Sequence, residues 1–100
     1  MKVRFRDEQL TDWYTGEYGG KQPFSEIVLK AYRKAVDKLV AAPNLVILKQ
    51  NKSLDLHPLK GDLAGRFAVR VNMQYRIVFG LIQETNLLEV IEIEDLTDYH

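Results

Sequence analysis

The clearest pattern of hydrophobic and polar positions lies in residues 23–44 and predicts a long amphipathic helix. Apolar pairs recur there at helical spacing, at Ile27/Val28, Ala31/Tyr32, Ala35/Val36 and Leu39/Val40. Lysine, arginine and aspartate occupy positions between the pairs, so one stripe of this helix should be buried and the opposite side solvated. Ser25 or Pro23 should mark its start, and Pro43 with Asn44 should end it.

The first residues predict a short strand followed by a short helix. Within residues 2–6, basic and apolar side chains alternate as in a strand. Asp7 can cap a helix on which Leu10, Trp13 and Tyr14 share one face. We interpret Trp13 and Tyr14 as core side chains rather than as a platform for stacking on bases, because they fall at the same buried spacing as Leu10.

After residue 65 the hydrophobic period changes to two, which predicts three consecutive strands. They are GRFAVRVN (65–72), YRIVFGLI (75–82) and LLEVIEIE (87–94). Short polar connections would join these strands into an antiparallel meander. Residues 45–63 give a weaker signal, in which LVILK is compatible with either a helix or a brief strand.

These elements predict an α+β fold, because the apolar stripe of the long helix needs a surface to cover. We expect a single domain, residues 1–100, with N-terminal helices packed on one face of a small antiparallel sheet. Strand parity places Arg66 and Arg70 opposite the apolar side chains of their own strand, and Arg76 should join them. The uncovered face of the sheet should therefore be basic.

The composition excludes several classes of protein. The chain has 100 residues and no cysteine, which excludes a disulfide framework, cysteine-based zinc sites and thiol catalysis. No apolar run approaches the roughly 20 residues that a membrane span needs. The N-terminus also lacks the apolar centre of a signal peptide, so we expect a cytoplasmic protein.

Charge is distributed unevenly although the formal net charge is zero. Residues 49–76 contain six basic and two acidic side chains, whereas the rest of the chain after Arg76 contains six acidic and no basic ones. A solvated face of mixed charge competes with a functional interpretation, an anion-binding centre beside an acidic edge. Glu92 and Glu94 share one side of the last predicted strand, which we interpret as an edge strand kept soluble by its acidic groups, or used by a partner.

The segment LHPLKGD (residues 56–62) is the first candidate for chemistry. Pro58 holds the backbone of His57 extended, and Lys60 follows next to a glycine turn. A histidine can transfer a proton near neutral pH, while lysine and the nearby arginines can stabilise a phosphate oxyanion. An ordinary surface loop is the competing interpretation.

The terminal tripeptide Asp98-Tyr99-His100 is the second candidate. Aspartate can hold an imidazole in one tautomer, and tyrosine can donate a hydrogen bond. His57 and His100 are the two histidines of the chain, and their separation matches no metal-ligand spacing. Phosphate-binding and dinucleotide-binding glycine motifs are absent from the sequence, so we expect neither a metal nor another cofactor.

In order and combination, LHPLKGD, GRFAVRVNMQYRIVF (residues 65–79) and the terminal DYH resemble the RelE/ParE toxin superfamily, and within it the HigB branch. The resemblance covers residues 54–100 firmly and the preceding helices loosely. It implies a RelE-like fold, similar to the one predicted above. It also implies the toxin of a type II toxin-antitoxin system, a ribosome-dependent mRNA endonuclease, or mRNA interferase, that inhibits translation.

The resemblance also implies roles for individual residues. Carried over by position, the catalytic set is His57, Lys60, Arg76, Asp98, Tyr99 and His100, and the residues that bind RNA phosphate are Lys60, Arg66, Arg70 and Arg76. His57 and His100 would act as general acid and general base, in an order that stays open. Asp98 would orient His100, and Tyr99 would position or stack on a base. The neutral net charge departs from the basic character of many relatives.

The partners that the resemblance implies are a cognate antitoxin protein, the A site of the 70S ribosome and mRNA. It implies no binding to a membrane. Two alternatives remain at this point. One is a ParE-like poison of DNA gyrase, which shares the fold but whose members generally lack the catalytic histidines. The other is an interaction module without catalytic activity.

Overall fold

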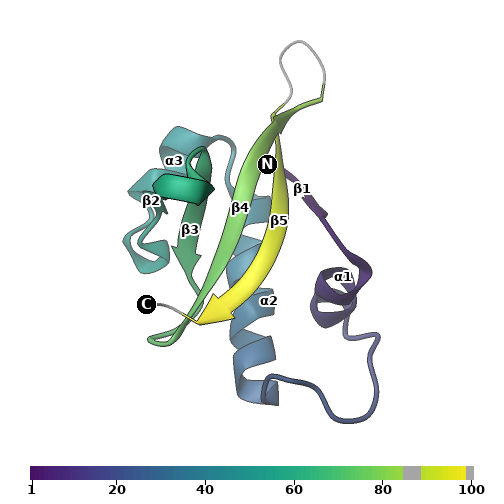
Figure 1. Ribbon diagram of the computed structural model, residues 1–100. Coiled ribbons are helices and arrows are strands. Elements are labelled where there is room, and N and C mark those ends of the chain that lie inside the picture. The colour runs from purple at the N-terminus through teal and green to yellow at the C-terminus, as the bar shows by residue number, and fades with distance from the viewer. Residues whose placement is uncertain (85–88, 99–100) are drawn as a thin grey trace.

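The structure is a computed structural model that describes residues 1–84 and 89–98 (Figure 1). Its helices are α1 (Glu8–Thr15), α2 (Glu26–Ala41) and α3 (Leu45–Gln50), with two short 3₁₀ turns, η1 (Lys52–Leu54) and η2 (Gly61–Leu63). Its strands are β1 (Lys2–Phe5), β2 (His57–Pro58), β3 (Arg66–Arg70), β4 (Tyr75–Gln83) and β5 (Glu89–Asp98).

Each of the three helices begins at a residue whose side chain caps it. Asp7, Ser25 and Asn44 accept a hydrogen bond from the backbone N–H three residues further on, at 3.1, 3.3 and 2.9 Å. Such caps satisfy backbone donors that the first helical turn leaves without a partner. The two predicted helices are confirmed, and the ambiguous LVILK segment is helical because Asn44 starts a new helix directly after Pro43.

The strands form one sheet in the order β1-β5-β4-β3-β2. The predicted meander is confirmed, since β3, β4 and β5 pair in antiparallel fashion. Strand β1 pairs with β5 in parallel, so the sheet is mixed at this end. The expectation that the last strand is an edge strand is wrong, because β1 pairs with it and forms the edge instead. This pairing places Arg4 opposite Glu92, with 3.0 Å between Arg4 Nε and Glu92 Oε2.

A β-bulge changes the side-chain alternation in the middle of β5. Val78 lies opposite Asp95 and Phe79 lies opposite Ile93, which leaves Glu94 as the extra residue. The bulge reverses the parity of the strand beyond this point. Leu96 is buried in the core in consequence, whereas uninterrupted alternation from Ile93 would have placed Asp95 there.

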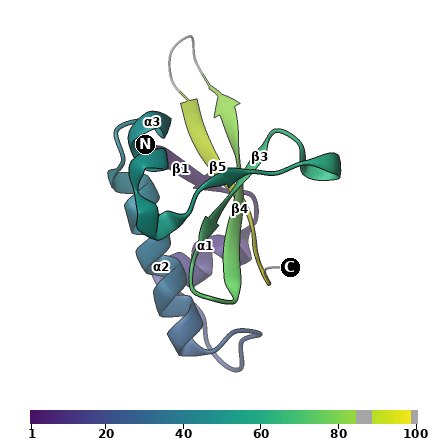
Figure 2. The same ribbon diagram turned by 90° about the vertical axis from the view of Figure 1, so that its left-hand side faces the viewer.

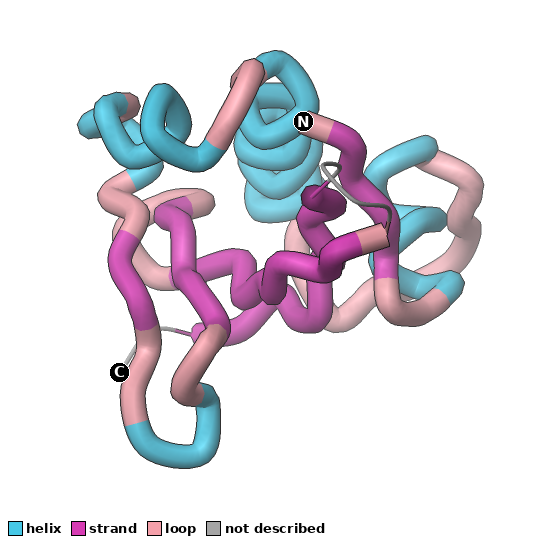
Figure 3. Tube along the Cα trace, turned by 90° about the horizontal axis from the view of Figure 1, so that it is seen from above, coloured by secondary structure: helices cyan, strands magenta, loops and turns pink. Residues whose placement is uncertain are grey.

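The helices cover one face of the sheet. Seen from above, α2 and α3 lie on one side, and the loop that contains η2 projects from the other (Figure 3). The same loop points away from α2 in the view turned by 90° (Figure 2). We call the side opposite the helices the open face. The predicted α+β fold with helices on one face is therefore confirmed.

The core lies between the helices and the covered face. Trp13 is 5% exposed and packs edge-on against Phe24 and Tyr32, which confirms its interpretation as a core residue. The Tyr32 hydroxyl donates to the Leu10 carbonyl at 2.9 Å, and burial raises the pKa of Tyr32. Tyr14 packs at the margin of this cluster, where its hydroxyl donates to Asp37.

Within the part of the chain that the structure describes, no helix has both the length and the apolar character needed to cross a membrane.

Candidate active site

An open hollow of about 170 Å³ lies on the open face, where four strands meet the loop that contains η2. Its polar lining consists of His57, Arg76, Thr97 and Asp98. Its apolar lining consists of Leu59, Leu63, Ala68 and Val78. The hollow thus brings together three residues that the sequence analysis singled out from segments far apart in the chain: His57, Arg76 and Asp98.

Strand register explains why these side chains meet. His57 on β2 is the partner of Ala68 on β3, which is in turn the partner of Val78 on β4. Arg76 on β4 is the partner of Thr97 on β5. Ala68 lies between His57 and Val78 across the sheet, and its small side chain leaves space there. Because β2 is a two-residue edge strand, Pro58 can follow His57 without removing a hydrogen bond that the sheet needs.

One backbone contact indicates the tautomer of the His57 ring. Its Nδ1 atom lies 3.0 Å from the carbonyl oxygen of Asp55. A carbonyl oxygen only accepts hydrogen bonds, so Nδ1 must carry a proton and donate it. Nε2 is then the ring nitrogen that carries the lone pair of the neutral imidazole.

Arg76 is the most deeply buried cation of the open face, with 6% of the residue exposed. Its Nη1 atom donates to the backbone carbonyls of Asn72 at 2.9 Å and Tyr75 at 3.2 Å. These bonds orient a guanidinium that keeps its charge at any physiological pH. The predicted site therefore has a fixed positive charge in the wall of the hollow.

The other two arginines of the predicted phosphate-binding set pair with carboxylates. Arg70 Nη2 lies 3.2 Å from Asp55 Oδ2, and Arg66 Nε lies 3.1 Å from both carboxylate oxygens of Glu94. Gly80 lies beneath the second pair, where an added Cβ would come within 3.3 Å of Glu94 Oε2. The open face thus carries arginines as predicted, but acidic partners from β5 and from the turn after η1 offset part of their charge.

Lys60 and the three C-terminal residues differ in how the structure places them relative to the hollow. Lys60 is exposed on the loop between Leu59 and Leu63 and does not itself line the hollow. Asp98 accepts a hydrogen bond from the Gln74 side-chain amide at 3.3 Å. Tyr99 and His100 lie outside the described residues. The roles assigned from the sequence to Lys60, Tyr99 and His100 stay predictions, as do those of the other site residues.

Sequence reasoning did not single out three residues that the structure puts at this site. Ala68 provides the space, Thr97 lines the hollow opposite Arg76, and Asp55 contacts both His57 and Arg70. A weak signal existed for Thr97, since it directly precedes Asp98. None existed for Ala68, because an alanine inside a strand carries no chemical signature.

A second hollow adjoins the first. It has a volume of about 190 Å³ and shares Leu63, Val78 and Thr97 with it. Arg6 and Asp95 complete its rim together with Glu94. The two hollows are therefore neighbours, and the second has two carboxylates and one arginine in its lining.

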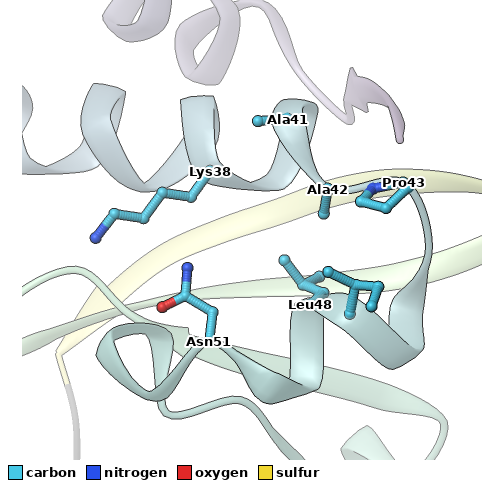
Figure 4. Close-up of a pocket in the computed structure, with 7 residues that line it drawn as sticks. Lys38, Ala41, Ala42, Pro43, Leu48 and Asn51 are labelled. Carbon is cyan, nitrogen blue, oxygen red and sulfur yellow. The ribbon is translucent and has the colours of Figure 1, made fainter.

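Another pocket, of about 230 Å³, lies between α2 and α3 (Figure 4). Figure 4 shows Lys38 on α2 and Asn51 at the end of α3 on opposite sides of it, with Ala42, Pro43 and Leu48 at its apolar end. Its lining contains one cation and no carboxylate or histidine. Acid-base chemistry therefore favours the hollow on the open face. Among residues 1–84 and 89–98, no three His, Cys, Asp or Glu side chains are grouped to hold a metal ion.

Comparisons with solved structures show proteins of similar fold. A YoeB/ParE toxin from Agrobacterium tumefaciens has a TM-score of 0.58 and 16% identity, with full coverage of both chains. YoeB in a YoeB-YefM complex from Staphylococcus aureus has a TM-score of 0.54 and 19% identity, covering 100% of this chain and 97% of the other. The YoeB dimer from the same organism gives 0.54 and 18%, with the same coverage. No curated protein matches the chain.

The sequence comparison with protein families is more specific than these likenesses of fold. The family described as RelE-like toxin of type II toxin-antitoxin system HigB matches residues 3–100, which is nearly the whole chain. The match includes the three motifs that carry the resemblance and the helices that precede them. The protein therefore belongs to the family of HigB-like toxins, the RelE-like toxins of type II toxin-antitoxin systems.

Proposed function

We propose that this toxin is a ribosome-dependent endoribonuclease that cuts mRNA in the A site and so inhibits translation. Toxins of the RelE, HigB and YoeB type are generally ribonucleases. The observation that carries the proposal is the hollow on the open face, where His57, Arg76 and Asp98 converge. A titratable imidazole beside a fixed guanidinium is the combination that RNA cleavage by the protein's own side chains requires.

The reaction begins with attack of a ribose 2′-oxygen on the adjacent phosphorus. One group removes the 2′-hydroxyl proton, a P–O bond forms, the bond to the 5′-oxygen breaks, and a second group delivers a proton to that oxygen. The products are a 2′,3′-cyclic phosphate and a free 5′-hydroxyl. His57 acts through Nε2 as one of the two groups, and His100 is the candidate for the other. Arg76 stabilises the negative charge of the crowded phosphorane.

The remaining predicted residues assist this reaction. Lys60 reaches the phosphate from its exposed loop when RNA is bound, and Asp98 and Tyr99 orient His100 or a base. Arg66 and Arg70 bind RNA phosphates more weakly than bare arginines would, because carboxylates already pair with them. No step requires a metal ion.

We also propose a cognate antitoxin as the partner that neutralises this toxin. One solved structure of similar fold is a YoeB-YefM complex, which supports a protein partner for the present chain. Ribosome binding is part of the proposal because the family resemblance implies it, and an open hollow on a 100-residue protein is compatible with a site that ribosomal RNA helps to complete.

Primer extension on a reporter mRNA in a bacterial translation extract tests the proposal. We expect cuts confined to the translated frame, which disappear in a parallel reaction where initiation is blocked. Cuts that persist on untranslated RNA would mean a ribonuclease that does not need the ribosome. Intact mRNA in both reactions would contradict the proposal and direct attention to DNA gyrase.

A further inference from the structure

We propose that Asp55 is a positioning residue that fixes the tautomer and orientation of His57. It precedes His57 by two residues and joins η1 to β2. Among the described residues other than glycine, it has the one positive φ, with φ 46° and ψ 49°. The consequence for catalysis rests on the proposed function, whereas the effect on the imidazole does not.

All three polar groups of Asp55 have partners in different elements. Its backbone N–H donates to the Lys52 carbonyl at 3.2 Å and closes η1. Its carbonyl accepts from His57 Nδ1 at 3.0 Å, and its carboxylate accepts from Arg70 Nη2 on β3 at 3.2 Å. One residue thus links η1, β2 and β3 around the histidine.

The surroundings leave the carbonyl of Asp55 little freedom. Leu54, directly before it, is fully buried in the core, and His57, two residues later, is held in β2 by its pairing with Ala68. The chain must turn between these fixed points, and the left-handed conformation of Asp55 makes the turn and aims the carbonyl at Nδ1. A right-handed or extended conformation would point that carbonyl elsewhere.

Aspartate suits this position better than most residues. A left-handed backbone is costly for side chains with a Cβ, least so for asparagine and aspartate and most for β-branched residues. Glycine would keep the backbone without the ion pair, and asparagine would keep the backbone and accept a hydrogen bond from Arg70 through a neutral amide oxygen. Valine would disfavour the turn itself. These substitutions therefore separate the backbone effect from that of the side chain.

The contact with Asp55 determines which ring nitrogen of His57 can accept a proton. With Nδ1–H held by a carbonyl, the neutral imidazole keeps its lone pair on Nε2, the atom that must take up the proton. Without that contact the ring can also populate the Nε2–H tautomer or turn over, and in such molecules Nε2 is not available to take up a proton. Asp55 acts through His57 and need not contact the RNA.

Long-range ¹H–¹⁵N NMR of the uniformly labelled full chain tests the inference. The chain has two histidines, so the spectrum of His100→Gln contains the ring signals of His57 alone and assigns them. Above the titration range of histidine, we expect the Nδ1–H tautomer of His57 in the wild type, Asp55→Gly and Asp55→Asn. We expect a mixture of tautomers in Asp55→Val. A wild-type His57 in the Nε2–H form, or an unchanged tautomer in a folded Asp55→Val, would overturn the proposal; Asp55→Ala replaces the valine variant if that one does not fold.

Cleavage rates provide a second, separable readout. In the translation extract, Asp55→Val should lose about 10-fold in kcat, the population factor that corresponds to the left-handed penalty. Asp55→Gly should restore most of that loss, which a merely lost side-chain contact would not allow. Absence of cleavage in the wild type would remove the proposed function and leave the NMR result standing. Normal cleavage in a variant with the wrong tautomer would remove the positioning role alone.

Discussion

The two faces of the sheet differ in what their side chains do. On the covered face, Val69, Ile77 and Phe79 are fully buried against the helices. On the open face, neighbouring positions of the same strands carry Arg66, Arg76 and the small residues around the hollow. Residues next to each other in sequence therefore have different tasks, because successive side chains of a strand point to opposite faces.

The energetic contributions of the two faces differ accordingly. Burial of apolar area on the covered face supplies the main free energy of folding, at about 25 cal/mol per Å². The ion pairs of the open face are partly exposed, and such pairs contribute roughly 0–1 kcal/mol each. Substitutions on the covered face should change stability, and substitutions on the open face should change activity.

The largest expected effect is on the covered face, at Phe79→Ala. The Phe79 ring is fully buried and stacks on Phe67 with 5.5 Å between the ring centroids. Its removal should lower the free energy of unfolding by about 3–5 kcal/mol, because the lost contacts leave a cavity. Urea denaturation followed by circular dichroism measures the change. A loss below about 1 kcal/mol would contradict the placement of the core on this face.

The matching substitution on the open face is His57→Ala. It should reduce cleavage in the translation extract by roughly 10²-fold or more, the scale of a lost general acid or base. The free energy of unfolding should change little, because His57 is only partly buried. Glu17→Gln, at an exposed position away from both hollows, is the control and should match the wild type. Undiminished toxicity of His57→Ala would instead favour a gyrase poison.

Arg76→Lys tests a residue for which the division between a stability face and an activity face does not hold. Arg76 lies on the open face but is buried, so the substitution should affect both properties. A lysine cannot reproduce the guanidinium geometry that bonds to the Asn72 and Tyr75 carbonyls. We expect a loss of about 1–3 kcal/mol in the free energy of unfolding, together with slower cleavage. Unchanged stability with slower cleavage would place Arg76 with His57 as a purely functional residue.

The smallest expected effect is a pH dependence at the exposed surface of the helices. Hydrogen bonds from Tyr18 and then Arg33 lower the pKa of Glu26 below its ordinary value of 4.5. A lowered pKa in the folded state contributes stability above the unfolded pKa, and that stability is lost as pH falls through the folded value. The urea midpoint of the wild type should therefore drop more between about pH 6 and pH 3 than that of Glu26→Gln. Equal drops in the two proteins would show that these contacts are not maintained in solution.

Much of the local structure could be predicted from the sequence. Helical spacing and the capping residues Asp7 and Ser25 predicted α1 and α2, and alternation with period two predicted β3 to β5. The ambiguity at LVILK followed from its length, since five apolar and basic residues fit either a helix turn or a strand. The motifs around His57 and Arg76 also carried the family resemblance.

The arrangement of those elements could not be read from the same patterns. Nothing in residues 2–5 says that they pair with a strand almost 90 positions later, and this pairing places β5 inside the sheet. The bulge at Glu94 depends on how two strands fit together, so alternation alone gave no sign of it. The same holds for Arg66 and Arg70, whose acidic partners come from β5 and from the turn at Asp55.

The sequence by itself determined most of the helices and strands, the alternation of side chains along β3 and β4, and which groups are able to transfer protons or hold a phosphate. These properties depend on local backbone preferences and on neighbours within a few positions. Only the tertiary structure decided that His57, Arg76 and Asp98 share one hollow, and that the Asp55 carbonyl meets the His57 ring. Those contacts depend on strand order, register and one left-handed turn, which long-range packing selects.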